Sequence, residues 1–166
     1  MPYSITELNK MSREEFVNTL GTVFENTPDI AYRVWNQRPF TNVAKLHQCM
    51  VDVVKSASRD EQLKLIQAHP ELGSKATMAE ASVKEQAGAG LAQLSFEEYN
   101  RFQALNRAYK DKFGFPFIIA VKQHTKDSIL ESFEYRLENP IDVETEQALT
   151  EIAQIARFRL AELVSE

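Results

Sequence analysis

The sequence has little of what marks several classes of protein. Its single cysteine, Cys49, excludes a disulfide within the chain and fits a reducing compartment. Cys49 lies in the apolar run from Val43 to Val54, so we expect a small core residue rather than a nucleophile. Five glycines and six prolines in 166 residues are few for an all-β chain with many tight turns.

Basic clusters and long apolar runs are also missing. The net charge is −5 and no group of Lys and Arg forms a basic patch, so we expect no nucleic-acid partner. No run approaches the roughly 18 apolar residues of a membrane span, and we expect no membrane partner. The first residues lack a secretory signal and the last lack a peroxisomal tripeptide. Together with the lone cysteine, these absences predict a cytoplasmic protein.

The most frequent local pattern in the sequence is the signal for the start of a helix. The capping box Ser-x-x-Glu begins at Ser12, Ser58, Ser82 and Ser95, and Thr27-Pro28 and Thr41 add two further starts. The apolar residues that follow recur at helical spacing. These patterns predict helices over 13–25, 28–37, 42–56, 59–67, 83–92, 96–112, 126–138 and 143–164. Since strand signals are nearly absent and no linker appears, we expect an all-α fold of about eight helices in one domain, 1–166.

One apolar stretch breaks the helical pattern. Phe113 to Val121 is rich in β-formers, but Pro116 lies inside it and a lone strand cannot form a sheet. We expect a buried extended connector that runs into a short helix. It is either simple core or one wall of a pocket, where irregular backbone offers amides and carbonyls to a heterocyclic ligand.

His69 is the first candidate for chemistry. Pro70 disfavours helix at His69, so the preceding helix should end there. The imidazole then either caps the helix and interacts with its dipole, or serves as a general acid or base.

Glu85 and Gln86 follow Ser82 at the next predicted helix start. Glu85 takes the position of a capping glutamate, which also makes it a rigid carboxylate. Gln86 faces another direction and can present its amide to a ligand.

Arg159 falls in the inward stripe of the last predicted helix, seven residues after Ile152 and four before Leu163. Burying an unpaired arginine is costly. Arg159 must therefore pair with a carboxylate, contact backbone carbonyls or face a polar ligand, whereas Arg157 has an easier route to solvent.

Several site signatures are absent. His47 and His124 have no ligand spacing with His69, so a zinc site is not expected. No phosphate loop, nucleophile elbow, Cys-x-x-Cys pair or carboxylate cluster appears. These absences favour chemistry without metal or cofactor, or no chemistry.

Motifs over nearly the whole chain resemble those of the 2-oxo-4-hydroxy-4-carboxy-5-ureidoimidazoline (OHCU) decarboxylase family. The order of the His-Pro and Phe-Gly-Phe-Pro-Phe motifs in a helical chain makes the combination specific. The matching stretches are Ile5-Thr6-Glu7-Leu8-Asn9, Phe24-Glu25-Asn26-Thr27-Pro28, Arg38-Pro39-Phe40, Ala68-His69-Pro70-Glu71-Leu72-Gly73, Ser82 with Glu85-Gln86-Ala87-Gly88, Phe102-Gln103-Ala104-Leu105-Asn106, Tyr109, Lys112-Phe113-Gly114-Phe115-Pro116-Phe117-Ile118 and Arg159-Leu160.

The resemblance implies a cofactor-free carbon–carbon lyase of urate degradation that converts OHCU to (S)-allantoin. It also implies an all-α fold and usually a homodimer. His69, Glu85 and Arg159 match the family's active-site positions. The residues that match its pocket lining are Pro70, Ser82, Gln86, Phe117, Ile119 and Val121.

Two other functions fit the residues without the resemblance. A non-enzymatic helical interaction module needs only capping boxes, amphipathic helices and an acidic surface. A hydrolase of a related ureido or imidazolone compound would use His69 to activate water.

Overall fold

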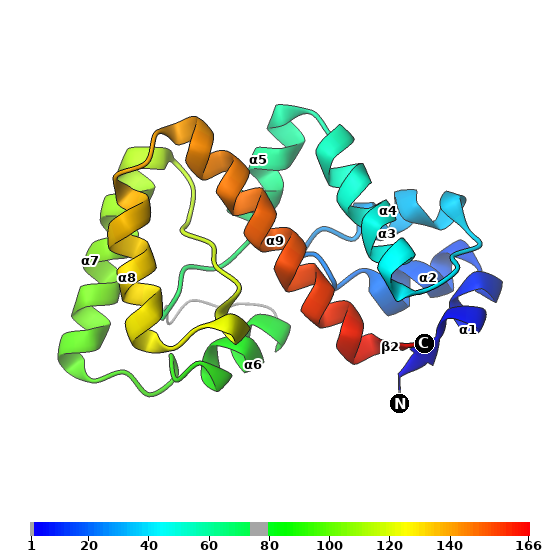
Figure 1. Cartoon of the computed structure of the whole chain (residues 1–166), viewed down its shortest axis with the longest axis horizontal. Coiled ribbons are helices and arrows are strands. Elements are labelled where there is room, and N and C mark those ends of the chain that lie inside the picture. The colour runs from blue at the N-terminus through cyan, green and yellow to red at the C-terminus, as the bar shows by residue number, and fades with distance from the viewer. Residues whose placement is uncertain (1, 74–79) are drawn as a thin grey trace. The chain divides into compact units, whose positions relative to one another are not determined.

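The computed structural model describes residues 2–73 and 80–166. In these residues it contains nine α-helices, two short 3₁₀-helices and one pair of two-residue strands, which confirms the all-α prediction (Figure 1). The chain divides into two compact units, Met1–Leu65 with Ala153–Glu166, and Ile66–Ile152. Each unit is described by itself, and the single domain over 1–166 stays a prediction.

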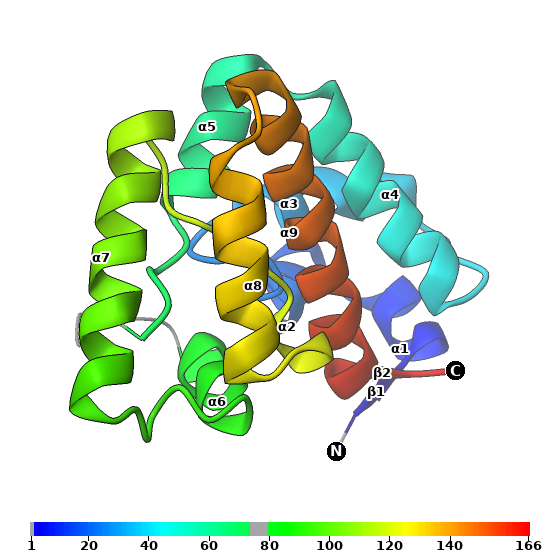
Figure 2. The same ribbon diagram turned by 60° about the vertical axis from the view of Figure 1, so that its left-hand side comes forward.

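The first unit begins and ends in a small parallel strand pair. Its elements are β1 (Tyr3–Ser4), α1 (Ile5–Lys10), α2 (Arg13–Leu20), α3 (Asp29–Val34), η1 (Trp35–Gln37), α4 (Val43–Ser56), most of α5 (Arg59–Gln67), the last part of α9 (Ile141–Leu163) and β2 (Val164–Ser165). Tyr3 lies opposite Val164, and both figures show the two strands beside the chain ends (Figures 1 and 2). The sequence pattern did not predict this pairing, because its partners come from opposite ends of the chain.

Serine caps start several helices as predicted. Ser12, Ser58 and Ser95 each accept the N–H of the glutamate three residues later at 3.1–3.2 Å. Ser4 and Glu7 form a further capping box that starts α1, a helix the sequence analysis did not predict. The helix α4 is capped by Asn42, whose side chain accepts the N–H of Lys45 at 2.8 Å, so the prediction of Thr41 as the cap was wrong.

The first predicted helix, 13–25, is shorter than expected. α2 ends at Leu20, and Gly21 N–H donates to Val17 C=O at 2.7 Å. A Cβ at Gly21 would lie 2.5 Å from that same oxygen, so this close turn requires glycine. Val23 and Phe24 are buried all the same, at 1% and 2% exposure. Their apolar spacing therefore reflected burial in a loop rather than a continuing helix.

The second unit is built around two long helices. Its elements are α6 (Glu80–Gly88), α7 (Phe96–Phe113), η2 (Val121–Gln123), α8 (Lys126–Leu137) and the first part of α9. α7 and α8 lie side by side and run in the same direction, so the segment between them runs back along the pair (Figures 1 and 2). Gly114, with φ of 80°, ends α7 in the left-handed conformation that makes this reversal possible.

The core of the second unit is aromatic. Tyr109 contacts Phe113, Phe115, Phe117 and Phe133, with ring centroids 4.5–6.3 Å apart. The rings of Phe117 and Phe133 stack at 3.8 Å. The segment before η2 is thus buried, irregular and followed by a short helix, as the sequence predicted.

Candidate active site

His69 lies directly after α5, as its Pro70 neighbour predicted. α5 ends at Gln67, and His69 N–H donates to Ile66 C=O at 3.2 Å. The side chain is buried, at 7% exposure. Burial places this imidazole away from bulk water, which suits a proton-transfer group as well as a helix cap.

The segment after His69 is held by polar side chains of α6 and α7. Gln86 Oε1 accepts Gly73 N–H at 3.0 Å, and Asn106 Nδ2 donates to Leu72 C=O at 2.9 Å. Gln86 is buried at 7% exposure and Asn106 at 2%. The Gln86 carbonyl therefore has a structural role in ordering this turn, which the sequence analysis did not foresee.

Ser82 does not cap α6. The helix begins at Glu80, two residues before Ser82, so the predicted capping box with Glu85 was wrong. The predicted helix over 83–92 is present, but it begins three residues earlier and ends at Gly88. Ser82 is instead a buried residue inside the first turn, at 4% exposure, and Glu85 is half-buried one turn later. Both side chains stay on the same helix as Gln86, and α6 packs against η2.

The connector Phe117–Val121 forms a buried wall beside η2. Phe117, Ile119 and Val121 are 1–6% exposed. Ile119 makes no backbone hydrogen bond to any residue in the described part of the chain, whereas Ile118 and Ala120 each make one to a charged side chain. A buried peptide group without a protein partner is rare and needs a water or a ligand. This supports the alternative in which the connector receives a ligand.

Arg159 belongs to the first unit. It is buried, at 4% exposure, as the helical stripe predicted. Its Nη2 lies 3.1 Å from Glu25 Oε2, and Nη1 donates to the carbonyls of Thr22 and Val23 at 3.4 and 3.5 Å. These carbonyls are available because α2 ends at Leu20. Arg157 is exposed and donates to Gln154 at 3.1 Å, as expected.

The second unit thus supplies His69, Pro70, Ser82, Glu85, Gln86 and the connector, while the first supplies Arg159. The roles of these residues in a common site stay a prediction. Residues 74–79, which join His69 and its turn to α6, lie outside the described residues.

The second unit holds a buried charge network that the sequence pattern did not predict. Arg136 Nε donates to Glu144 Oε1 at 2.8 Å, Tyr109 Oη donates to the same oxygen at 2.6 Å, and Asn139 Nδ2 donates to Oε2 at 2.9 Å. Burial and the hydrogen bond to Glu144 raise the pKa of Tyr109 far above its usual range. Arg136 falls one turn after Phe133 on the apolar face of α8. The helical spacing that predicted an inward Arg159 therefore also predicts an inward Arg136.

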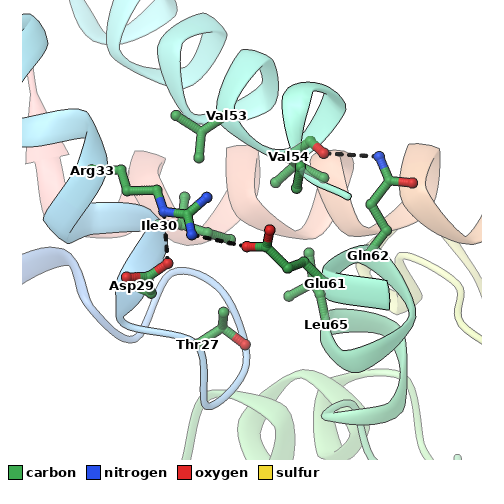
Figure 3. A pocket seen from close by; sticks show the side chains of 10 residues that line it. Thr27, Asp29, Ile30, Arg33, Val53, Val54, Glu61, Gln62 and Leu65 are labelled. Atoms are coloured by element: carbon green, nitrogen blue, oxygen red, sulfur yellow. Dashed lines mark hydrogen bonds and ion pairs between the residues drawn. The ribbon is translucent and has the colours of Figure 1, made fainter. Parts of the chain in front are cut away.

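Two hollows lie within single units. One, of about 40 Å³ in the first unit, has an apolar floor that includes Val53, Val54 and Leu65. Arg33 bridges Asp29 and Glu61 at its rim, at 2.8 and 2.9 Å (Figure 3). The other, of about 310 Å³, is lined by Gly73, Leu91, Ala92, Leu94, Ser95, Phe96 and Tyr99. Neither is lined by a residue that the sequence singled out for chemistry.

The remaining candidates have structural partners. His47 Nε2 lies 2.8 Å from Ala153 C=O, and His124 Nδ1 lies 3.0 Å from Ser128 Oγ. Cys49 is buried, which confirms the core prediction. In the described residues, no group of His, Cys, Asp and Glu is placed to hold a metal ion, and no helix is long and apolar enough to cross a membrane.

Comparison with known proteins identifies the family. A family model described as OHCU decarboxylase matches residues 9–161, so the chain belongs to this family. It is 42% identical over 160 residues to the 2-oxo-4-hydroxy-4-carboxy-5-ureidoimidazoline decarboxylase of Halalkalicoccus jeotgali, covering 96% of this chain and 91% of that protein. It is 46% identical over 164 residues to the uric acid degradation bifunctional protein PucL of Bacillus subtilis, covering 99% of this chain but only 33% of PucL.

Two solved structures are similar to this chain over most of its length. A crystal structure of (S)-allantoin synthase has a TM-score of 0.82 at 27% identity, covering 99% of this chain and 54% of that one. A crystal structure of OHCU decarboxylase in the presence of (S)-allantoin has a TM-score of 0.71 at 26% identity, covering 92% and 98%. The fold and the family thus agree.

Proposed function

We propose that this chain, as a member of the OHCU decarboxylase family, removes the carboxyl group of OHCU and yields (S)-allantoin. The family match over residues 9–161 is the observation that carries the proposal. The buried His69 supports it, and so do the Ile119 peptide groups, which have no backbone hydrogen bond within residues 2–73 and 80–166, because a small polar heterocycle needs such groups. Family membership also favours an enzyme over a helical interaction module.

The chemistry needs no metal or organic cofactor, because the substrate carries its own electron sink. A C=N bond lies next to the carbon that bears the carboxylate. When the bond to CO₂ breaks, its electron pair forms a C=C bond and the C=N electrons move to nitrogen. The nitrogen takes a proton, the resulting enol-like species takes a second proton on the neighbouring carbon, and its hydroxyl gives up a proton as the carbonyl forms, so the net reaction consumes one proton.

The protein residues guide these protons. In this proposal, His69 hydrogen-bonds the carboxylate or hydroxyl side and takes part in proton transfer, which is worth roughly 10²–10⁴ in rate. Glu85 orients His69 or the ureido group. Arg159 holds a ring carbonyl or the developing negative charge. Since the reaction also proceeds unaided, control of the face that receives the proton is a large part of the benefit.

The pocket lining follows the same family positions. Pro70, Ser82, Gln86 and the backbone of Phe117–Val121 would contact the substrate ring and its ureido arm. The partner is therefore a small molecule. A homodimer and a cytoplasmic location complete the proposal, and sedimentation of the purified chain tests the dimer.

Circular dichroism of allantoin formed from freshly oxidised urate tests the activity, with and without the preceding hydrolase. We expect the chain to accelerate formation of optically active (S)-allantoin and to release CO₂. A product that retains the carboxyl group would instead indicate the hydrolase alternative.

His69→Asn is the decisive variant for the catalytic residue. It should lose most turnover and keep the helical far-UV spectrum, because an amide cannot transfer the proton. Wild-type rates of (S)-allantoin formation by this variant would contradict the role of His69.

A further inference from the structure

The connector Phe117–Val121 is held at two backbone groups by charged side chains. Ile118 C=O accepts Arg136 Nη1 of α8 at 2.6 Å, and Ala120 N–H donates to Glu151 Oε1 of α9 at 3.0 Å. Ile119 lies between these two points, buried at 5% exposure and without a backbone hydrogen bond in the described residues. The two bonds therefore leave the peptide groups of Ile119 for another partner.

Arg136 is itself immobilised. Its Nε is bonded to Glu144, whose carboxylate is fully buried and also accepts from Tyr109 and Asn139. The guanidinium carbon lies 4.3 Å from the centre of the Phe117 ring. Arg136 thus contacts the connector through both a side chain and a carbonyl, and it cannot turn without leaving a buried carboxylate unpaired.

Glu151 is the more accessible of the two. It is half-buried, and its Oε2 accepts Gln147 Nε2 one turn earlier on α9 at 3.0 Å. This bond fixes the rotation of the carboxylate, so that Oε1 faces the Ala120 amide.

We propose that Arg136 and Glu151 are positioning residues that hold the Ile119 peptide groups in place for the substrate. The inference rests on the proposed function, in which the connector lines the site. Neither residue needs to touch the substrate. Because a displaced wall weakens binding before it affects proton transfer, their loss should raise KM more than it lowers kcat.

Glu151→Ala and Glu151→Gln form the main test, with KM and kcat for fresh OHCU and the Kd of (S)-allantoin by calorimetry. Glu151→Ala should raise KM and Kd about tenfold, the size of one net hydrogen bond. Glu151→Gln keeps an oxygen that can accept from Ala120 and should recover most of the affinity. Glu131→Ala, an exposed glutamate on α8, is the matched control and should leave both values unchanged.

Amide hydrogen exchange at Ala120, followed by NMR, gives a readout besides activity. Loss of its acceptor in Glu151→Ala should speed exchange at Ala120, while amides inside α7 keep wild-type rates. Faster exchange at Ala120 with unchanged KM and Kd would overturn the proposal, because the bond would then hold the wall without serving the substrate.

The double variant Arg136→Met with Glu144→Gln tests the other contact without leaving a buried charge unpaired. It should raise KM and Kd at least as much as Glu151→Ala. A folded double variant with wild-type KM would remove Arg136 from the proposal, and if this variant does not fold, the Glu151 series decides.

The activity of the wild-type chain shows whether a negative result contradicts the positioning role alone or the proposed function itself. If it forms no (S)-allantoin faster than buffer, the proposed function falls and the inference falls with it. If the wild type is active and Glu151→Ala has wild-type KM and Kd, only the positioning role is overturned.

Discussion

In the part of the chain that the structure describes, each unit buries one arginine, and the two arginines differ in the hydrogen bonds that hold them. Arg136 in the second unit makes bonds of 2.6 and 2.8 Å to a carbonyl and to Glu144, a carboxylate with two further donors. Arg159 in the first unit lies 3.1–3.5 Å from Glu25 and from two loop carbonyls. Both side chains are nearly inaccessible, at 6% and 4% exposure.

Burial alone therefore does not distinguish a scaffold residue from a substrate residue. Short bonds in a shared network suit a fixed scaffold, because removing one member leaves several others unsatisfied. Longer bonds to loop carbonyls are weaker and are more easily exchanged for bonds to an incoming anion or carbonyl. On this comparison, Arg136 should matter most for folding and Arg159 most for ligand binding.

Glu144→Ala should have the largest effect on stability. It leaves the Arg136 guanidinium buried without its carboxylate, so we expect a loss of about 3–5 kcal/mol in the free energy of unfolding. Urea denaturation followed by far-UV circular dichroism measures it, with Glu131→Ala as the control. A loss as small as that of the control would show that the network does not stabilise the second unit.

Arg159→Met should weaken ligand binding more than it lowers stability. The Kd of (S)-allantoin, measured by calorimetry, should rise about tenfold or more, which is about 1.4 kcal/mol or more. Arg159→Met also removes this partner from the carboxylate of Glu25, which is 1% exposed, so stability is measured on the double variant Arg159→Met with Glu25→Gln, which should lose less than Glu144→Ala. If the double variant instead loses as much stability and Arg159→Met leaves the Kd unchanged, Arg159 is a structural residue like Arg136.

Tyr109→Phe removes one donor from Glu144 and should cost about 1 kcal/mol of stability near neutral pH. The pKa of Tyr109 is raised on folding, so its contribution is present below about pH 10, the ordinary tyrosine pKa, and declines above it. Between pH 9 and pH 10.5, the urea midpoint of unfolding should therefore fall more for the wild type than for Tyr109→Phe. Parallel declines would argue against ionisation of Tyr109 on unfolding.

Arg33→Ala should have the smallest effect. Arg33 pairs with Asp29 and Glu61 on the surface of the first unit, with side chains 45–58% exposed, so solvent screens the pairs. The hydrogen bond from Arg33 lowers the pKa of Glu61, so this contribution is present above the ordinary glutamate pKa and is lost as pH falls. The urea midpoints of variant and wild type should converge in acid, and a constant gap would contradict this.

Local signals in the sequence predicted helix starts well. Ser12, Ser58 and Ser95 cap their helices because the bond they make closes within three residues. Ser82 carries the same pattern yet lies inside α6, which begins at Glu80. The capping-box pattern thus shows where a helix can begin, but the helix can still begin a few residues earlier in the chain.

The sequence pattern did not predict hydrogen bonds between residues that lie far apart in the chain. The inward position of Arg159 followed from helical spacing, but its partner Glu25 lies 134 residues away. The apolar periodicity also wrongly predicted that the first helix continues through Val23 and Phe24. Buried loop residues are as apolar as buried helix residues, so the pattern could not tell them apart. The early end of α2 is what supplies the Thr22 and Val23 carbonyls to Arg159.

The sequence by itself determined the helical class, the family and the identity of the candidate residues, since these depend on local hydrogen bonds and on the order of motifs. Only the tertiary structure decided that Gln86 orders the turn after His69 and that Arg136 and Glu151 hold the connector. The physical reason is that each of these bonds joins segments at least 13 residues apart. Their energy appears only when packing has brought both ends together and removed water from between them.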